Sequence, residues 1–88
     1  MSFVNQMNFL SATISGLPDL MQLRIRDSFV LFAQSIAKAD KVFETYLDFE
    51  GLVDSFQLSL DQKDKIKTHA IRLLETRITD LDIMEGTK

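Results

Sequence analysis

His69 is the side chain best suited to acid–base chemistry in this sequence, because an imidazole titrates near neutral pH. It is the single histidine among 88 residues, and the chain has no cysteine. Nucleophilic catalysis would need a serine, a histidine and an orienting carboxylate, with donors that bind an oxyanion. The sequence has three glycines and no nucleophile turn among them. We therefore predict that His69 is an ordinary, partly exposed structural residue and that the protein is not an enzyme.

The acidic segment before Gly51 suggests at first a calcium loop, with Asp48 and Glu50 at alternate positions. An EF-hand loop needs glycine at its sixth position and a bidentate glutamate at its twelfth. Counted from Asp48, the glycine is fourth and the twelfth residue is Ser59, so the pattern does not fit. Thiolate metal sites, phosphate-binding loops and dinucleotide fingerprints have no counterpart in the sequence. We expect no metal and no cofactor.

Basic residues gather near the start and middle of the last predicted helix. They are Lys63, Lys65, Lys67 and Arg72. A basic helix can contact nucleic acid, and a nucleic-acid-binding regulator that uses this C-terminal helix is the alternative function. These positions are spread around the helix, acidic residues are interleaved, and no aromatic residue lies among them to stack on bases. With a net charge of −3, a solvated charged face is favoured. Segments 40–54 and 63–72 could pair within a bundle or between chains.

The N-terminal segment, residues 1–17, contains no charged side chain. Phe3, Met7, Leu10 and Ile14 recur at helical spacing, which predicts one apolar stripe on an amphipathic helix. Gly16 is expected to end this helix in the left-handed conformation. The helix can dock on its own bundle or on another chain, and the spacing favours neither.

The second predicted helix begins at Pro18, which suits a first helical turn. Its apolar stripe contains Met21, Ile25, Phe29, Phe32 and Ile36. Residues 29–33 are apolar on every side, and Val30 and Leu31 point away from the stripe. A helix that is apolar all round is central in its fold or contacts two partners at once.

Asp40 is interpreted as a cap or kink that opens a third segment, which Gly51 interrupts. Ser59 and Gln62 have the spacing of a capping box and open the last helix. The apolar face of that helix contains Ile66, Ala70, Leu73, Leu74, Ile78 and Leu81. Arg77 falls within the same face, so its stem lies on apolar surface or its guanidinium forms an interchain ion pair. The aromatic residues, Phe43 among them, are interpreted as core packing.

These segments, near 2–14, 18–38, 40–56 and 60–84, predict an all-α fold, a small three- to four-helix bundle in a single domain of residues 1–88. A chain this short buries only about 60–65% of its unfolded surface, and disulfides cannot reinforce it. Association is the remaining reinforcement. We therefore expect a homo-oligomer, a homodimer or higher, with the second copy as the protein partner.

The predicted function is a non-enzymatic protein–protein interaction module: an adaptor, regulator, inhibitor or assembly subunit that acts through apolar helix faces. The interface residues that we predict are Phe3, Met7, Leu10, Ile14, Val30, Leu31 and Arg77. No apolar run approaches the roughly 20 residues of a membrane span, and the N-terminus lacks the features of a secretory signal. The expected location is the cytoplasm.

Overall fold

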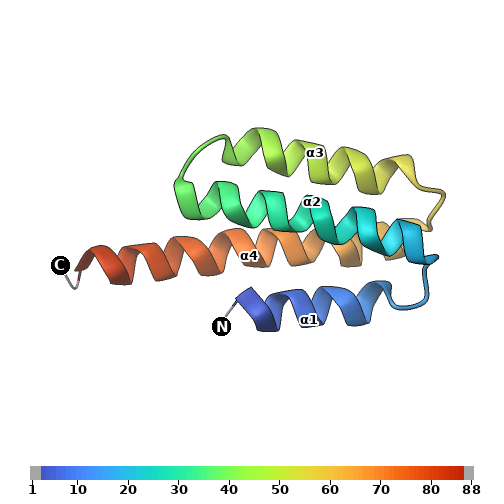
Figure 1. Cartoon of the computed structure of the whole chain (residues 1–88), viewed down its shortest axis with the longest axis horizontal. Helices are drawn as coiled ribbons and strands as arrows, with labels where there is room; N and C mark the ends of the chain where they lie inside the picture. The colour runs from blue at the N-terminus through green and yellow to red at the C-terminus, as the bar shows by residue number, and fades with distance from the viewer. Residues whose placement is uncertain (1–2, 87–88) are drawn as a thin grey trace.

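Four helices make up the described part of the chain, residues 3–86, in a computed structural model that describes side chains from Phe3 to Thr76 (Figure 1). They are α1 (Phe3–Ile14), α2 (Asp19–Lys38), α3 (Val42–Ser55) and α4 (Leu60–Gly86). Each boundary lies within two residues of the segments that the hydrophobic spacing predicts. The prediction of an all-α small helical bundle is confirmed.

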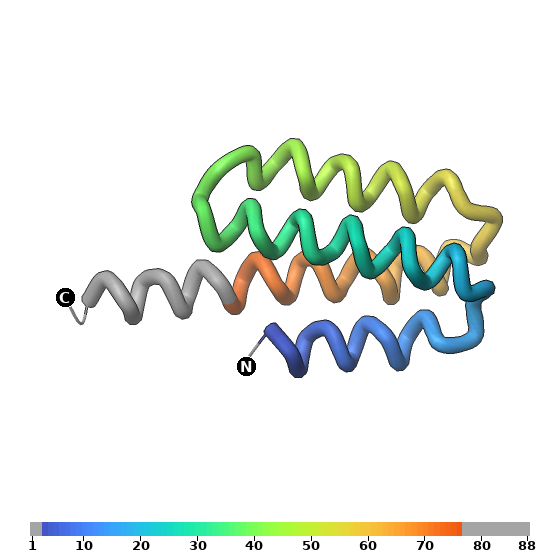
Figure 2. Tube along the Cα trace, in the orientation of Figure 1, coloured from blue at the N-terminus to red at the C-terminus, as the bar shows by residue number. Residues whose placement is uncertain are grey.

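Successive helices run antiparallel, and short connections join them (Figure 1). α2 and α4 pack against each other in the middle, and each also packs against α1 and α3. α1 and α3 lie on opposite sides of this pair, as the trace in Figure 2 also shows. The longest dimension of 45 Å is set by the 27 residues of α4, which span about 40 Å at a rise of 1.5 Å per residue.

The core is formed where the apolar stripes of the four helices meet. Its fully or almost fully buried residues are Leu10, Ile14, Ile25, Phe29, Phe32, Ile36, Phe49, Val53, Ile66, Ala70 and Leu73. Phe29 is its aromatic centre, with ring centroids 6.1 Å from Phe3 and 5.8 Å from Phe49. Aromatic pairs at this separation add about 0.5–1.5 kcal/mol beyond their buried area. The stripe predicted for the second helix is therefore the central surface of the bundle.

The start of α4 and the end of α1 confirm one prediction of the sequence and correct another. The backbone N–H of Gln62 donates to Ser59 Oγ at 3.1 Å, which confirms Ser59 as the cap of α4. Gly16 does not adopt a positive φ, so the prediction that it ends α1 in the left-handed conformation is wrong. Instead, the side chain of Gln22 donates to the carbonyl oxygens of Ser15 at 3.2 Å and Leu17 at 2.8 Å. These bonds hold the connection without help from the glycine. Pro18 directly precedes α2 and occupies its N-cap position.

The turn between α2 and α3 contains the strained backbone that glycine would relieve. Ala39 and Lys41 both have a positive φ, of 53° and 55°. The N–H of Asp40 donates to the carbonyl oxygen of Ser35 at 3.1 Å and closes α2. The prediction that Asp40 caps the third helix is therefore wrong, because Lys41 occupies that position and no side chain caps it. Gly51 also does not interrupt a helix, since α3 runs through it to Ser55.

Candidate interaction surfaces

His69 is buried against α1, with 8% of its surface exposed, which corrects the expectation of a partly exposed side chain. Its Nε2 lies 2.7 Å from Thr13 Oγ1, and the Thr13 hydroxyl lies 3.0 Å from the carbonyl oxygen of Phe9. Because the hydroxyl proton is donated to that carbonyl, Nε2–H must be the donor to Thr13 Oγ1. Nδ1 is then the unprotonated nitrogen, and within the described part of the chain no group bonds to it.

Burial, and next the positive charge of Arg72, lower the pKa of His69. The imidazole is therefore neutral at pH 7, and among the described residues no carboxylate is hydrogen-bonded to it. A second link between the same helices is the bond from Gln6 Nε2 to Thr76 Oγ1 at 3.3 Å. These contacts favour a role for His69 in fastening α1 to α4.

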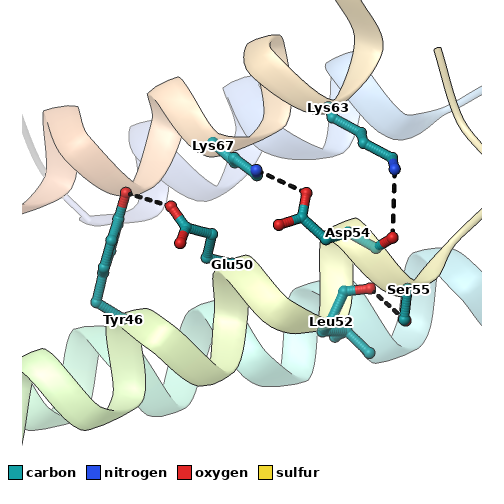
Figure 3. A network of polar contacts seen from close by, with 7 residues as sticks. All are labelled: Tyr46, Glu50, Leu52, Asp54, Ser55, Lys63 and Lys67. Carbon is teal, nitrogen blue, oxygen red and sulfur yellow. Dashed lines mark hydrogen bonds and ion pairs between the residues drawn. The ribbon is translucent and has the colours of Figure 1, made fainter. Parts of the chain in front are cut away.

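The seam between α3 and α4 is polar at the end where the two helices are connected (Figure 3). Lys67 Nζ lies 2.7 Å from Asp54 Oδ1, and Lys63 Nζ donates to the carbonyl oxygen of Asp54 at 3.2 Å. The hydrogen bond to Asp54 raises the pKa of Lys67. One turn before Asp54 on α3, Glu50 Oε2 accepts a hydrogen bond of 3.2 Å from the Tyr46 hydroxyl. Burial, followed by the charge of Glu50, raises the pKa of Tyr46.

Of the two pairings that the sequence left open, these contacts show the one within a bundle, because Asp54 of the acidic segment meets Lys63 and Lys67 of the basic segment in one chain. Lys65 also has an acceptor, Asp61, at 3.2 Å. The lysines at 63, 65 and 67 are therefore engaged by the chain itself, which favours the interpretation of this patch as a paired, solvated face. Such exposed pairs add at most about 1 kcal/mol each, so their main effect is to fix how α3 lies on α4.

Beyond this polar end, the same seam opens into an apolar groove of about 430 Å³. Val42, Phe43 and Tyr46 line it from α3, and Ile71 and Leu74 line it from α4. We call it the α3/α4 groove. Phe43 is 71% exposed there, so its interpretation as a core residue is wrong. A signal in the sequence could have found it: Val42, Tyr46 and the buried Phe49 are spaced by four and three residues, and Phe43 lies one position off that stripe.

A second hollow, of about 290 Å³, lies between the start of α1 and the second half of α2. Its lining residues are Phe3, Val30, Ala33, Gln34 and Ala37, none of them charged. The surroundings are also uncharged in sequence, since neither residues 3–18 nor residues 28–37 include an acidic or basic side chain. We call this surface the α1/α2 face. It lies on the side of the bundle opposite the α3/α4 groove, because α1 and α3 occupy opposite sides (Figure 1).

No protein-family model, curated protein or solved structure matches this chain. Within the described residues, no group of three or more histidine, aspartate and glutamate side chains is placed to hold a metal ion. None of the helices there is long and apolar enough to cross a membrane.

The predicted interface residues lie in three different environments. Leu10 and Ile14 are fully buried in the chain's own core, and Phe3 and Met7 pack against that core, so α1 docks on its own bundle. Val30 lies beside Phe3 in the hollow of the α1/α2 face.

Leu31, which is 59% exposed, lies on another side of α2 and lines a shallow hollow with Lys38 and Lys41. The structure therefore separates it from Val30. The side chain of Arg77 lies outside the described residues.

Proposed function

We propose that this protein is a cytoplasmic, non-enzymatic interaction subunit that assembles with a second copy of itself through the α1/α2 face. The observation that carries this proposal is the uncharged hollow of that face, in which Phe3 and Val30 are both partly exposed. An adaptor or assembly subunit needs an accessible apolar surface of this kind and no reactive group.

The symmetry of a homodimer favours this face over the other surfaces. In a two-fold interface the same patch occurs on both partners, so charged groups near the axis meet their own copies. Each chain has a net charge of −3, yet neither stretch that forms this face has a charged residue. Pairing here brings no like charges together. It also leaves no ion buried without water, which would cost several kcal/mol.

The size of the face predicts how strong the association is. A helix of 12 residues is about 18 Å long, and two neighbouring helices are about 20 Å wide. This is smaller than the standard contact, which buries about 800 Å² on each partner. We therefore expect a dimer that dissociates in the micromolar range.

The test introduces a charge into the hollow of the proposed contact. Ala37 is exposed and lines the hollow, so Ala37→Lys leaves the fold intact and places two desolvated ammonium groups in the dimer. Sedimentation velocity over a micromolar concentration series should give a dimer for the wild type and a monomer for Ala37→Lys. The matched control is Leu31→Lys, the same residue introduced at an exposed position on another side of the same helix.

Two results would contradict the proposal. A wild-type protein that stays monomeric throughout the series has no self-association to explain. A dimer that persists in Ala37→Lys but dissociates in Leu31→Lys uses another face of α2. Added salt serves as a further check, since an uncharged interface weakens little with ionic strength whereas phosphate contacts weaken steeply.

A further inference from the structure

We infer that α1 is held to α4 by an acid-sensitive clasp, and that protonation of His69 releases α1 while the other three helices stay packed. The clasp is the hydrogen bond between the His69 ring and the Thr13 hydroxyl, 2.7 Å long, across the seam between the two helices. The release needs no second copy of the chain, so it is independent of self-association through the α1/α2 face.

The neutral imidazole fits its site in the closed bundle, and the protonated one does not. With Nε2–H donated to Thr13, an added proton can bind only at Nδ1, which is buried and has no hydrogen-bond partner within the described residues. Protonation therefore creates a buried N–H donor without an acceptor and a positive charge without water. Both cost free energy until the ring reaches solvent.

The charged groups around the ring do not offset this cost. Burial, and then the positive charge of Arg72 three residues farther along α4, lower the pKa of His69. Lys65, a second cation, lines the small hollow beside the ring. α1, which covers the ring, has no charged residue from Phe3 to Ile14. Among the described residues of α2 and α3 there is no charge that shifts this pKa.

α1 is the helix that can give way to the protonated ring. It packs against α2 and α4 but not against α3, and residues 15–18 join it to α2 (Figure 1). A free helix of 12 residues without ion pairs is marginal in water, so α1 depends on its packing. Burial of Leu10 and Ile14 keeps it closed at neutral pH. Its release leaves α2, α3 and α4, which all pack against one another.

Amide hydrogen exchange of the full-length protein, followed by NMR between about pH 7.5 and 5, measures the release. Each rate is corrected for the intrinsic pH dependence of exchange. An exposed histidine titrates near 6.5, so the opening of α1 should increase up to about tenfold for each pH unit below that value, until the pKa of the closed ring is reached. Amides of residues 6–14 should lose protection in this way, whereas those of residues 29–32 and 49–53 should keep theirs. The single histidine reports its own protonation in the same samples.

Three variants separate the effect of the proton from that of the hydrogen bond. His69→Gln keeps a donor for Thr13 and cannot titrate, so its α1 protection should not depend on pH. Thr13→Val removes the acceptor and keeps the imidazole, so α1 should be about fivefold less protected at neutral pH and should still lose protection in acid. Ala37→Lys should show the same pH dependence as the wild type, because the release needs no second copy.

Three results would overturn the inference. Equal loss of protection in all four helices means that acid unfolds the whole bundle. A ring that becomes protonated while residues 6–14 keep their protection means that the imidazole turns into the adjacent hollow and α1 stays in place. A pH dependence that persists in His69→Gln belongs to other titrating groups.

Discussion

Phe32→Ala and Phe43→Ala remove the same side chain at a buried and at an exposed position. The difference between their losses in free energy of unfolding measures how much the buried position contributes to the stability of the core. Phe32 is fully buried, and its ring centroid lies 5.7 Å from that of Tyr46. Truncation of a buried phenylalanine costs about 3–5 kcal/mol, of which the aromatic pair contributes about 0.5–1.5. Phe43 is 71% exposed, so it loses less than a third of the transfer free energy, at most about 1 kcal/mol. We expect the two free energies of unfolding to differ by at least about 2 kcal/mol.

The assay is urea unfolding followed by far-ultraviolet circular dichroism, at one fixed protein concentration because dimerisation stabilises the folded state. A chain of 88 residues has a total stability of about 4–13 kcal/mol, so Phe32→Ala can unfold it outright. Phe32→Leu keeps most of the volume and provides a folded variant, with an expected loss of about 1 kcal/mol. A loss below about 1 kcal/mol for Phe32→Ala, or equal losses at the two positions, would refute the assignment of the core.

Two further predictions concern the backbone and the single histidine. Ala39→Gly relieves a positive φ, and Gly51→Ala replaces a glycine at an open position within α3. Each should raise the free energy of unfolding by about 0.5–1 kcal/mol and therefore raise the urea midpoint. A midpoint lowered by both changes would mean that these backbone conformations are misassigned. Burial lowers the pKa of folded His69, so its contribution to stability is complete above the unfolded value of about 6.5 and is lost as pH falls from there through the folded pKa. Unfolding between pH 5 and 7 should show this loss in the wild type, and its persistence in His69→Leu would assign it to other groups.

The sequence predicts the helices because their signals are local. A residue on a helix shares a face with those three and four positions away, so Ile25, Phe29 and Phe32 mark the buried stripe of α2 without any knowledge of its neighbours. The cap at Ser59 is equally local, since its hydroxyl reaches only three residues along the chain. A local signal in the sequence fails where a side chain from another helix makes the hydrogen bonds that hold a turn. Gly16 needs no left-handed conformation because Gln22, on the next helix, holds the turn.

The candidate surfaces are less predictable because they depend on which helix lies beside which. Val30 and Leu31 are equivalent in the sequence as apolar residues off the α2 stripe. α1 packs beside Val30, whereas Leu31 faces the side of the α2–α3 turn, so one residue joins an uncharged hollow and the other is surrounded by lysines and an aspartate. Phe43 differs from its aromatic neighbours by a single position on α3, and that position turns its ring out into the groove.

The sequence by itself determined four helices, the cap of α4 at Ser59 and the buried stripes, because backbone hydrogen bonding and helical spacing act within a few residues. Only the tertiary structure decided that His69 is buried under α1, that Asp54 meets Lys67 and that the two apolar surfaces lie on opposite sides of the bundle. Thr13 and His69 are 56 positions apart along the chain. Their meeting depends on the rotation and sliding of α1 on α4. The packing of all four helices together fixes this rotation and sliding, and the residue pattern along any one helix does not determine them.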